Sequence, residues 1–587
     1  MRKHFRRLGL PLILVLLFGT LALSVSAQDE VAREDTVIFD IDASNVPNPT
    51  NFNYLVPGTN QNQGAHQVLW EPLFILNYET GNIDPWLGTA FTANETQDVW
   101  TLTLRDGVTW SDGEPFTADD VVFTIQMLLD DKTATLADAA NMQQWVESVT
   151  KVDDLTVQFD LKAPNPRFQL DYFSVRIWGG INIQPKHIWE GQDPFTFTNY
   201  DPDKGWPVGT GPYKLTSADP TSFIWDRRDD WWGATSGFSE LPEPKRLVWQ
   251  INGSEENKAQ LMSNHQLDSA MDISLGAFEA IQARNPNVVA WYTDLPYAWA
   301  DPCPRQLTLN LTVAPWDDPN MRKAVSLLID RNQIVEVAYE GTSIPSETMF
   351  VDYPAMDPFI NAIVDAGMTI DPVARPDEGK ALIEAAGWTL NDAGIYAKDG
   401  AELRLDIIFP NGFIEASRSV DVVVEQLRAA GIDATSHPLA DATNFENRDT
   451  GNFEGIWNWD ACGSINEPWN SMNHFIADFV VPVGERAPGG NNYQRWNTEG
   501  TQAYTEIVKQ IGSLPLGDPS IPGMVAEAYR YIYDETVVIP LTQAKKLVPF
   551  DTTYWTGWPT ADDNYIQPTT WWQSTLPIIL KLHKAGS

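Results

Sequence analysis

Residues 99–124 constrain the fold more than any other segment of the chain. Residues 100–105 alternate apolar and polar side chains, with Trp100, Leu102 and Leu104 on the apolar face, and this period of two predicts a half-buried β-strand. Two Asp-Gly turns follow, and Thr117 then stands three residues before Asp120, a spacing that predicts a capping box at the start of a helix. Because a strand, two tight turns and a capped helix follow one another so closely, the segment predicts an α/β scaffold and contains no recognisable catalytic group.

Four further segments have the same character. Residues 209–213 (GTGPY) lead from a loop into a predicted strand, where we expect the glycines to serve turn geometry and not phosphate binding. Asp318, which is followed by proline, is a good N-cap for a helix within residues 309–335. Residues 378–388 and 422–432 predict helices that end at glycine. Each of these segments is ordinary scaffold when it is considered alone.

Taken in order, the five segments resemble the family 5 solute-binding proteins, which are the oligopeptide-type receptors of ABC importers. The resemblance implies an α/β, two-lobe periplasmic-binding-protein-like fold of the large type, with an extra subdomain in lobe I and a ligand cleft between the lobes. We expect lobe I at residues 28–303, lobe II at 304–542 and a C-terminal return to lobe I at 543–587. Two crossing strands, near 305–311 and 539–543, are expected to form the hinge.

The N-terminus predicts export. Residues 1–27 combine four basic residues, an apolar core at 8–23 and small residues before Gln28, which is the pattern of a signal peptide cleaved after Ala27. The alternative is a single membrane anchor, but sixteen core residues are fewer than the roughly 20 that a span needs. No cysteine precedes Cys303, so the thiol of a lipoprotein anchor is missing. We therefore expect a soluble periplasmic or extracellular protein.

Charge and size limit the possible partners. Cleavage would remove four basic and no acidic residues, leaving 35 Lys and Arg against 79 Asp and Glu, a formal charge of −44. Such a charge repels phosphate backbones and anionic lipid heads, so neither nucleic acid nor a membrane surface is an expected partner. The 560 remaining residues are too many for one core, which agrees with two lobes. We expect a monomer that binds a small oligomeric solute and the permease subunits of an ABC transporter.

Two cysteines connect the scaffold with a candidate binding segment. In an exported protein with only Cys303 and Cys462, a disulfide is the default expectation, and an oligopeptide-binding member of the resembled family has one at corresponding places. Residues 462–468 (CGSINEP) resemble that protein's segment C-A-D-Y-N-E-P, whose Asp holds the α-ammonium group of a peptide. Ser464 stands at the position of that Asp, which weakens the case for a peptide ligand. Asp460 would compensate for the missing carboxylate if its side chain pointed inward.

The same segment is rich in tryptophan and asparagine, a composition suited to sugars, because aromatic faces stack on the C–H faces of the rings while polar groups reach the hydroxyls. The predicted ligand contacts are Trp457, Asn458, Trp459, Asp460, Ser464, Asn466 and Trp469. Residues 554–572 also resemble the subgroup of family 5 receptors that bind cello- and other β-linked oligosaccharides. The alternative is that these tryptophans fill the core of a large lobe.

Enzyme signatures are missing from the sequence. The seven histidines form no H-E-x-x-H motif, no G-x-S-x-G motif occurs, and no acidic run has the spacing of a calcium loop. A glycoside hydrolase needs only two facing carboxylates, and with 79 acidic residues such a pair is not excluded by counting. We expect a receptor without catalytic activity, cofactor or metal. Its expected ligand is an oligosaccharide, with an oligopeptide as the alternative. A secreted glycoside hydrolase is the third possible function of the protein.

Overall fold

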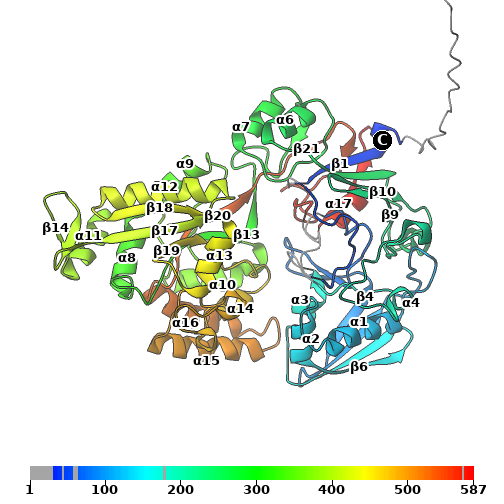
Figure 1. Ribbon diagram of the computed structural model, residues 1–587, viewed down its shortest axis with the longest axis horizontal. Helices are drawn as coiled ribbons and strands as arrows, with labels where there is room; N and C mark the ends of the chain where they lie inside the picture. Colours follow the sequence, from blue (N-terminus) through cyan, green and yellow to red (C-terminus); the bar gives the residue numbers. More distant parts are fainter. Residues whose placement is uncertain (1–30, 42–44, 57–63, 176–179, 572–573, 587) are drawn as a thin grey trace, which may run out of the picture.

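The computed structural model describes residues 31–41, 45–56, 64–175, 180–571 and 574–586, so the predicted signal peptide lies outside the described residues. Figure 1 shows two lobes that lie side by side. The N-terminal part of the chain and its C-terminal segment share one lobe, and the middle of the chain forms the other.

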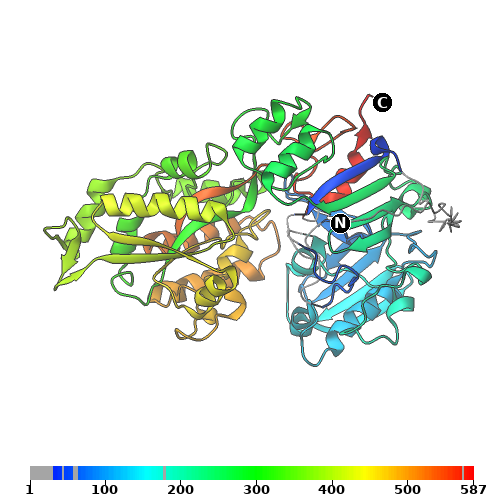
Figure 2. The ribbon, with the colours of Figure 1, turned by 45° about the horizontal axis from the view of Figure 1, so that its top comes forward.

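Lobe I has a four-stranded main sheet with the strand order β1-β11-β10-β9. Strand β1 runs parallel to β11, and the other pairs are antiparallel. The strands are β1 (Thr36–Ile41), β9 (Tyr213–Asp219), β10 (Ser222–Arg227) and β11 (Arg246–Ile251). Figure 2 shows this sheet beside the returning C-terminal segment, which contains α17 (Thr575–Lys581). Other short elements are β12 (Val288–Val289), β21 (Phe550–Asp551), β22 (Trp555–Thr556), β23 (His583–Lys584), α6 (Glu255–Ser263) and α7 (Leu275–Gln282).

The glycines of residues 209–213 allow two backbones to approach closely. A Cβ atom at Gly209 would lie 2.1 Å from the carbonyl oxygen of Leu69, and one at Gly211 would lie 2.2 Å from that of Val68. The amide of Gly211 donates to the carbonyl of Leu69 over 2.8 Å. The GTGPY segment therefore serves chain packing at the start of β9, and its glycines provide close approach of two backbones where the sequence had suggested turn geometry.

A second sheet of lobe I contains the segment with which the sequence analysis began. It has the order β4-β5-β7-β6, and β5 shows the predicted alternation of buried and half-buried residues. Thr117 and Asp120 form the predicted capping box at the start of α1. The elements are β4 (Gly88–Ala93), β5 (Val99–Leu104), β6 (Val146–Asp153), β7 (Thr156–Leu161), α1 (Ala118–Asp130) and α2 (Ala139–Trp145). Nearby are β2 (Phe74–Leu76), β3 (Ile83–Pro85), β8 (Ser174–Val175), α3 (Phe168–Tyr172), α4 (Lys186–Trp189) and α5 (Trp232–Thr235).

Lobe II is built on a five-stranded sheet with the order β18-β17-β19-β13-β20. Helix α12 packs against β17 and β18, and α9 packs against β20. Asp318 caps α8 as predicted, by accepting a hydrogen bond from the amide of Asn320. The elements are β13 (Trp299–Leu309), β17 (Arg404–Pro410), β18 (Asp433–Leu439), β19 (Gly455–Asn458), β20 (Ile539–Lys546), α8 (Pro319–Leu328), α9 (Arg331–Ala338), α11 (Pro376–Ala385), α12 (Ile414–Ala429) and α13 (Asp441–Thr450), with a hairpin of β14 (Thr389–Leu390), β15 (Tyr396–Lys398) and β16 (Ala401–Glu402).

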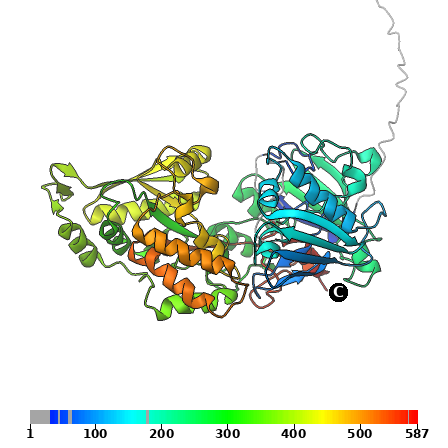
Figure 3. The same cartoon turned by 90° about the horizontal axis from the view of Figure 1, so that it is seen from below.

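A layer of helices completes lobe II, as Figure 3 shows from below. Helix α16 contacts both α10 and α15, and α14 contacts α15. These helices are α10 (Asp357–Asp365), α14 (Trp469–Asn473), α15 (Glu499–Ser513) and α16 (Ile521–Asp534). None of the helices in the described residues is long and apolar enough to cross a membrane.

Two strands carry the chain between the lobes. Strands β13 and β20 pair in antiparallel fashion from Trp299 opposite Lys546 to Leu307 opposite Ile539. Because they belong to the sheet of lobe II and lead directly into lobe I at one end, groups on these strands are placed between the lobes.

Candidate functional site

A cavity of about 540 Å³ lies between the lobes beside the crossing strands. Ligand sites in proteins are commonly clefts of this size. Lobe I contributes Glu255, residues 271–276 and Trp571 to its wall. Lobe II contributes Ala338, Tyr339, Glu340, Thr342, residues 412–415, Arg418 and Asp441, and the crossing strand β20 contributes Lys545 and Lys546.

Ion pairs connect many of the charged groups in this wall. Arg418 contacts Glu340 at 3.2 Å within lobe II. Lys545 contacts Asp272 at 3.2 Å and thereby joins the crossing strand to lobe I. Glu415, in the first turn of α12, accepts hydrogen bonds on Oε1 from Nε and Nη2 of Arg305 at 3.0 and 2.5 Å. The wall is thus highly polar, while much of its charge is balanced locally.

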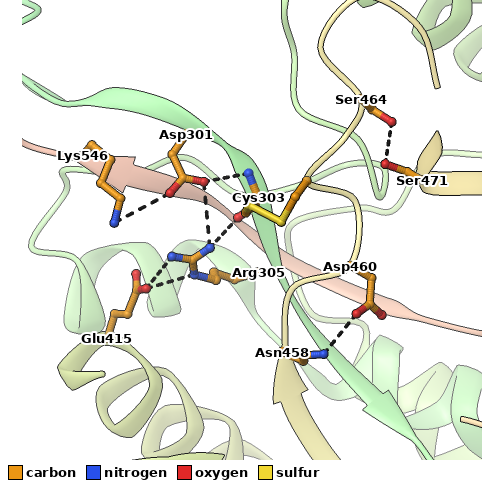
Figure 4. Close-up of a disulfide and its surroundings, with 10 residues drawn as sticks. Asp301, Cys303, Arg305, Glu415, Asn458, Asp460, Ser464, Ser471 and Lys546 are labelled. Atoms are coloured by element: carbon orange, nitrogen blue, oxygen red, sulfur yellow. Dashed lines mark hydrogen bonds and ion pairs between the residues drawn. A yellow bond between two sulfur atoms is a disulfide. The ribbon is translucent and has the colours of Figure 1, made fainter. Parts of the chain in front are cut away.

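The ion pairs continue behind the wall along the two crossing strands (Figure 4). Asp301 lies 3.7 Å from Lys546 and accepts a hydrogen bond from the amide of Cys303 at 2.6 Å. Arg305 donates to the carbonyl of Cys303 at 2.5 Å. Burial raises the pKa of Asp301, and the charges of Arg305 and Lys546 oppose that rise. The network therefore links lobe I, both crossing strands and α12 of lobe II.

Aromatic side chains lie on the lobe II side of the cavity. Phe413 lines the cavity and packs against Trp459 with ring centroids 5.2 Å apart. Trp459 is half-buried and contacts Trp457 edge to face at 5.7 Å. The guanidinium of Arg305 lies 5.5 Å from the ring of Trp457 and 5.3 Å from that of Trp459. Trp457 has no exposed surface, so in this conformation it belongs to the core of lobe II.

The structure joins Cys303 to Cys462 by a disulfide, as the two thiols of the sequence led us to expect (Figure 4). The bond attaches the loop after β19 to the crossing strand β13. Ser464, two residues beyond the disulfide, is fully buried. Its hydroxyl lies 2.7 Å from that of Ser471, so it points toward α14 and not toward the cavity.

Asp460 is buried in a polar network. Its carboxylate accepts hydrogen bonds from Tyr493 at 2.7 Å, from Asn458 at 3.0 Å and from the side-chain amide of Gln306. Burial raises the pKa of Asp460 to about 6, against the lowering effect of its hydrogen bonds. This carboxylate is buried, has three donors within the protein and does not line the cavity, so in this conformation it is not placed to replace the carboxylate missing at Ser464.

The last two predicted contacts lie where the lobes meet. The Cβ atom of Asn466 would be 3.5 Å from a Cβ atom built on Gly81 of lobe I. The ring of Trp469 lies 4.8 Å from the guanidinium of Arg167, and its indole N–H donates to the carbonyl of Val508 at 3.0 Å. In the described part of the chain, none of the seven predicted contacts lines the cavity, and Trp459 approaches it only through Phe413. A role of these seven residues in ligand binding stays a prediction.

Sequence reasoning missed the groups that form the cavity wall. Glu415 and Arg418 lie in a helix and Tyr339 directly follows one, in ordinary sequence with no motif around them. Lys545 and Lys546 carried a usable signal, because two adjacent lysines follow a predicted crossing strand in a strongly acidic chain. Within the described ranges, no group of three or more His, Cys, Asp or Glu side chains is arranged to hold a metal ion.

Comparison with known proteins decides the family. A family model described as bacterial extracellular solute-binding proteins, family 5, middle region, matches residues 82–479. The chain belongs to this family. This family 5 chain is 25% identical over 501 residues to the nickel-binding periplasmic protein of Escherichia coli (strain K12). The match covers 82% of this chain and 85% of that relative.

Solved structures show the same fold. A periplasmic oligopeptide-binding protein of an oligopeptide ABC transporter from Thermotoga maritima matches with a TM-score of 0.81 at 22% identity, covering 94% of this chain and 99% of that one. A structure of that protein with bound mannohexaose matches with a TM-score of 0.74 at 21% identity, covering 95% and 100%. The predicted α/β two-lobe fold is therefore confirmed. Membership in family 5 makes the chain a substrate-binding receptor of an ABC importer.

Proposed function

We propose that this receptor captures a neutral oligosaccharide of the cello-, xylo- or β-glucan type in the cavity between its lobes and delivers it to the permease. The observation that carries the proposal is the pairing of charges in the cavity wall. Arg418 pairs with Glu340, Lys545 with Asp272, and Glu415 with Arg305 behind the wall. A charged ligand would have to compete with these pairs, whereas a neutral sugar leaves them intact.

Paired charges still bind hydroxyl groups well. A carboxylate that accepts from one cation keeps further lone pairs, and a lysine ammonium has three N–H donors. Phe413, Tyr339 and Trp571 add aromatic surface to the wall. A sugar therefore finds donors, acceptors and apolar faces in one cavity, and bridging waters can accommodate units that differ in a single hydroxyl.

The segment after β19 also favours a neutral ligand. Ser464 replaces the acidic residue that holds a peptide's ammonium group in the resembled oligopeptide-binding protein, and Asp460 is occupied by three donors. A buried ammonium group without a carboxylate costs several kcal/mol. The mannohexaose bound to the Thermotoga maritima protein agrees with a sugar in a fold of this kind.

An oligopeptide is the second candidate, because acidic residues outnumber basic ones in the cavity wall. Glu255 accepts hydrogen bonds from the amide and hydroxyl of Ser274, and Asp441 accepts one from the amide of Gly412. Neither contact supplies a positive charge. The ammonium group of a peptide could therefore pair with one of these two carboxylates.

A thermal-shift screen tests the proposal. Cello-, xylo- and manno-oligosaccharides are compared with di- to pentapeptides, since a ligand at 100 times its Kd adds about 2.7 kcal/mol of stability. We expect a shift with at least one sugar and none with peptides. The Phe413→Ala variant should reduce that shift, because Phe413 lines the cavity. The matched control Phe195→Ala removes an exposed ring from a different hollow of lobe I and should leave the shift unchanged.

Two further features belong to the proposal. The receptor should bind without turnover, so incubation with cello-oligosaccharides should give no hydrolysis above background. The signal peptide should be removed after Ala27, so the mass of the exported protein should correspond to a chain that begins at Gln28. Hydrolysis would favour the glycoside hydrolase alternative, and a retained N-terminus would favour a membrane anchor.

A further inference from the structure

Arg167 of lobe I inserts its side chain into a group of hydrogen-bond acceptors on lobe II. Its Nε and Nη2 donate to Oε1 and Oε2 of Glu467 at 3.1 and 3.3 Å, and its Nη1 donates to the carbonyls of Gly512 and Leu514 at 2.9 and 3.4 Å. The guanidinium lies 4.8 Å from the ring of Trp469. We call Glu467, Trp469, Gly512 and Leu514 the arginine socket. Because only 1% of the arginine side chain is exposed, the contact is shielded from solvent.

The arginine socket is built by lobe II alone. Helix α15 ends at Ser513, so the carbonyls of Gly512 and Leu514 lie at its C-terminus, where carbonyl groups lack partners within the helix and the helix dipole is negative. The indole N–H of Trp469 donates to a carbonyl of the same helix at 3.0 Å, and its amide donates to Oε2 of Glu467 at 3.0 Å. The socket therefore combines a carboxylate, free carbonyls and an aromatic face, which together suit a guanidinium.

A second contact joins the lobes next to the socket. The connection between β2 and β3 of lobe I approaches lobe II closely, since a Cβ atom on Gly81 would lie 2.4 Å from that of Ala355 and 3.5 Å from that of Asn466. Asn466 directly precedes Glu467 in the chain. Tyr78, which is 1% exposed, packs against Tyr353 of lobe II with ring centroids 5.9 Å apart. A change in the angle between the lobes therefore has to disturb both contacts.

We propose that Arg167 and the arginine socket form a latch that holds the lobes in the described conformation when no solute is bound. In the described part of the chain, none of the latch residues lines the cavity, so their hydrogen bonds do not depend on whether the solute is a sugar or a peptide. A receptor that changes conformation binds its solute according to the energy difference between the conformations. The latch contributes to this difference in the free protein and so sets the fraction of receptor that is in the described conformation.

Removal of the arginine should reverse the balance between engaged lobes, with the latch formed, and separated lobes. In the engaged state, Arg167→Met leaves the carboxylate of Glu467 buried without its cation, whereas separation exposes that carboxylate to water. We expect the ratio of separated to engaged molecules to rise about 100-fold or more. Glu467→Gln keeps a neutral acceptor and should raise the ratio about tenfold. Lys509→Met is the matched control, because Lys509 pairs with Asp478 at the surface of lobe II.

The experiment measures the distance between the lobes by pulsed electron paramagnetic resonance in the exported protein, freed of solute by dialysis. Spin labels are attached at Val152→Cys of lobe I and Val364→Cys of lobe II, two exposed positions. The native cysteines are bonded to each other and do not take up label. We expect one narrow distance in wild type and in the control, and a second population of separated lobes in both latch variants.

The thermal unfolding temperature of each variant is recorded as well, because a merely structural role would lower the Tm without changing the distance. Equal distance distributions in wild type and both latch variants would overturn the latch, whatever the Tm. A broad distribution in wild type, with no dominant distance, would also overturn it. If Arg167→Met does not fold, Glu467→Gln decides alone. Because no solute enters these measurements, failure of the latch leaves the proposed function intact.

Discussion

Arg167 of lobe I and Glu467 of lobe II form an ion pair between the lobes, with Nε of the arginine 3.1 Å from Oε1 of the carboxylate. Both side chains are buried, at 1% and 7% exposure. Arg167 also donates to the carbonyl of Gly512 at 2.9 Å. The pair lies between α3 and α14, which face each other below the crossing strands in Figure 1. The lobes are therefore held together at a second place besides the strands.

We expect Arg167→Met to destabilise the described conformation by about 3–5 kcal/mol, because it leaves the carboxylate of Glu467 buried without its cation. Urea unfolding measures the change. Lys509→Met is the matched control, since Lys509 pairs with Asp478 at the surface and such pairs contribute about 0–1 kcal/mol. Equal losses of unfolding free energy in the two variants would show that the interlobe ion pair stabilises the protein no more than a surface pair does.

The disulfide should be formed in every molecule of the exported protein. A thiol assay on the unreduced, denatured chain should find no free thiol, because Cys303 and Cys462 are bonded to each other. The double variant Cys303→Ser/Cys462→Ser should lose about 2–5 kcal/mol of stability, since the bond closes a long loop. Two titratable thiols per chain would contradict the pairing.

The stability of Asp460→Asn relative to wild type should increase between pH 4.5 and pH 7.5. The pKa of Asp460 is raised from 3.8 to about 6 by burial, so the protonated acid is favoured in the folded state. Its stabilising effect is complete below the unfolded pKa and is lost as the pH rises through the folded pKa, with a total change of about 3 kcal/mol.

The asparagine side chain that replaces Asp460 in this variant does not titrate, so the variant does not lose this folding stability as the pH rises. Urea unfolding of both proteins at the two pH values measures the difference. A constant difference between the variant and wild type across this range would contradict the pKa shift.

Neighbouring tryptophans should respond differently to substitution. Trp457→Ala should cost about 3–5 kcal/mol of folding stability, because the ring is fully buried in the core of lobe II. Trp459→Ala should instead weaken sugar binding by about 1–3 kcal/mol, because Trp459 supports Phe413 at the cavity wall. Unfolding and titration experiments on both variants separate the effects, and unchanged affinity in Trp459→Ala would assign that ring to the scaffold.

The scaffold could be predicted from the sequence because its signals are local. The capping box of Thr117 and Asp120 and the N-cap at Asp318 depend on residues within one helical turn. The pairing of Cys303 with Cys462 followed from there being only two cysteines. The two caps are satisfied by short-range chemistry, so tertiary context does not change them, whereas the disulfide joins residues 159 apart and was predictable only because no other cysteine competes.

The candidate site could be predicted only in part, because its wall is assembled from segments far apart in the chain. Tyr339 follows α9, Glu415 lies on α12 and Lys546 ends β20, and no spacing in the sequence connects these three elements. Asparagine and tryptophan near Cys462 suggested a sugar site there, but composition does not reveal how deeply each ring is buried, and Trp457 lies within β19 while Trp459 lies just beyond its end. Trp457 faces the core, and Trp459 reaches the cavity side of the lobe.

The most direct test of the account is the Kd of the wild-type receptor for neutral oligosaccharides and for peptides, measured by calorimetry at about 0.05 and 0.5 M salt. We predict that at least one cello-, xylo- or manno-oligosaccharide binds, with a Kd that does not depend on salt because the ligand carries no charge. We predict no binding of di- to pentapeptides. Binding of peptides alone, weakened at the higher salt concentration, would contradict the neutral-sugar account while leaving the chain a family 5 receptor.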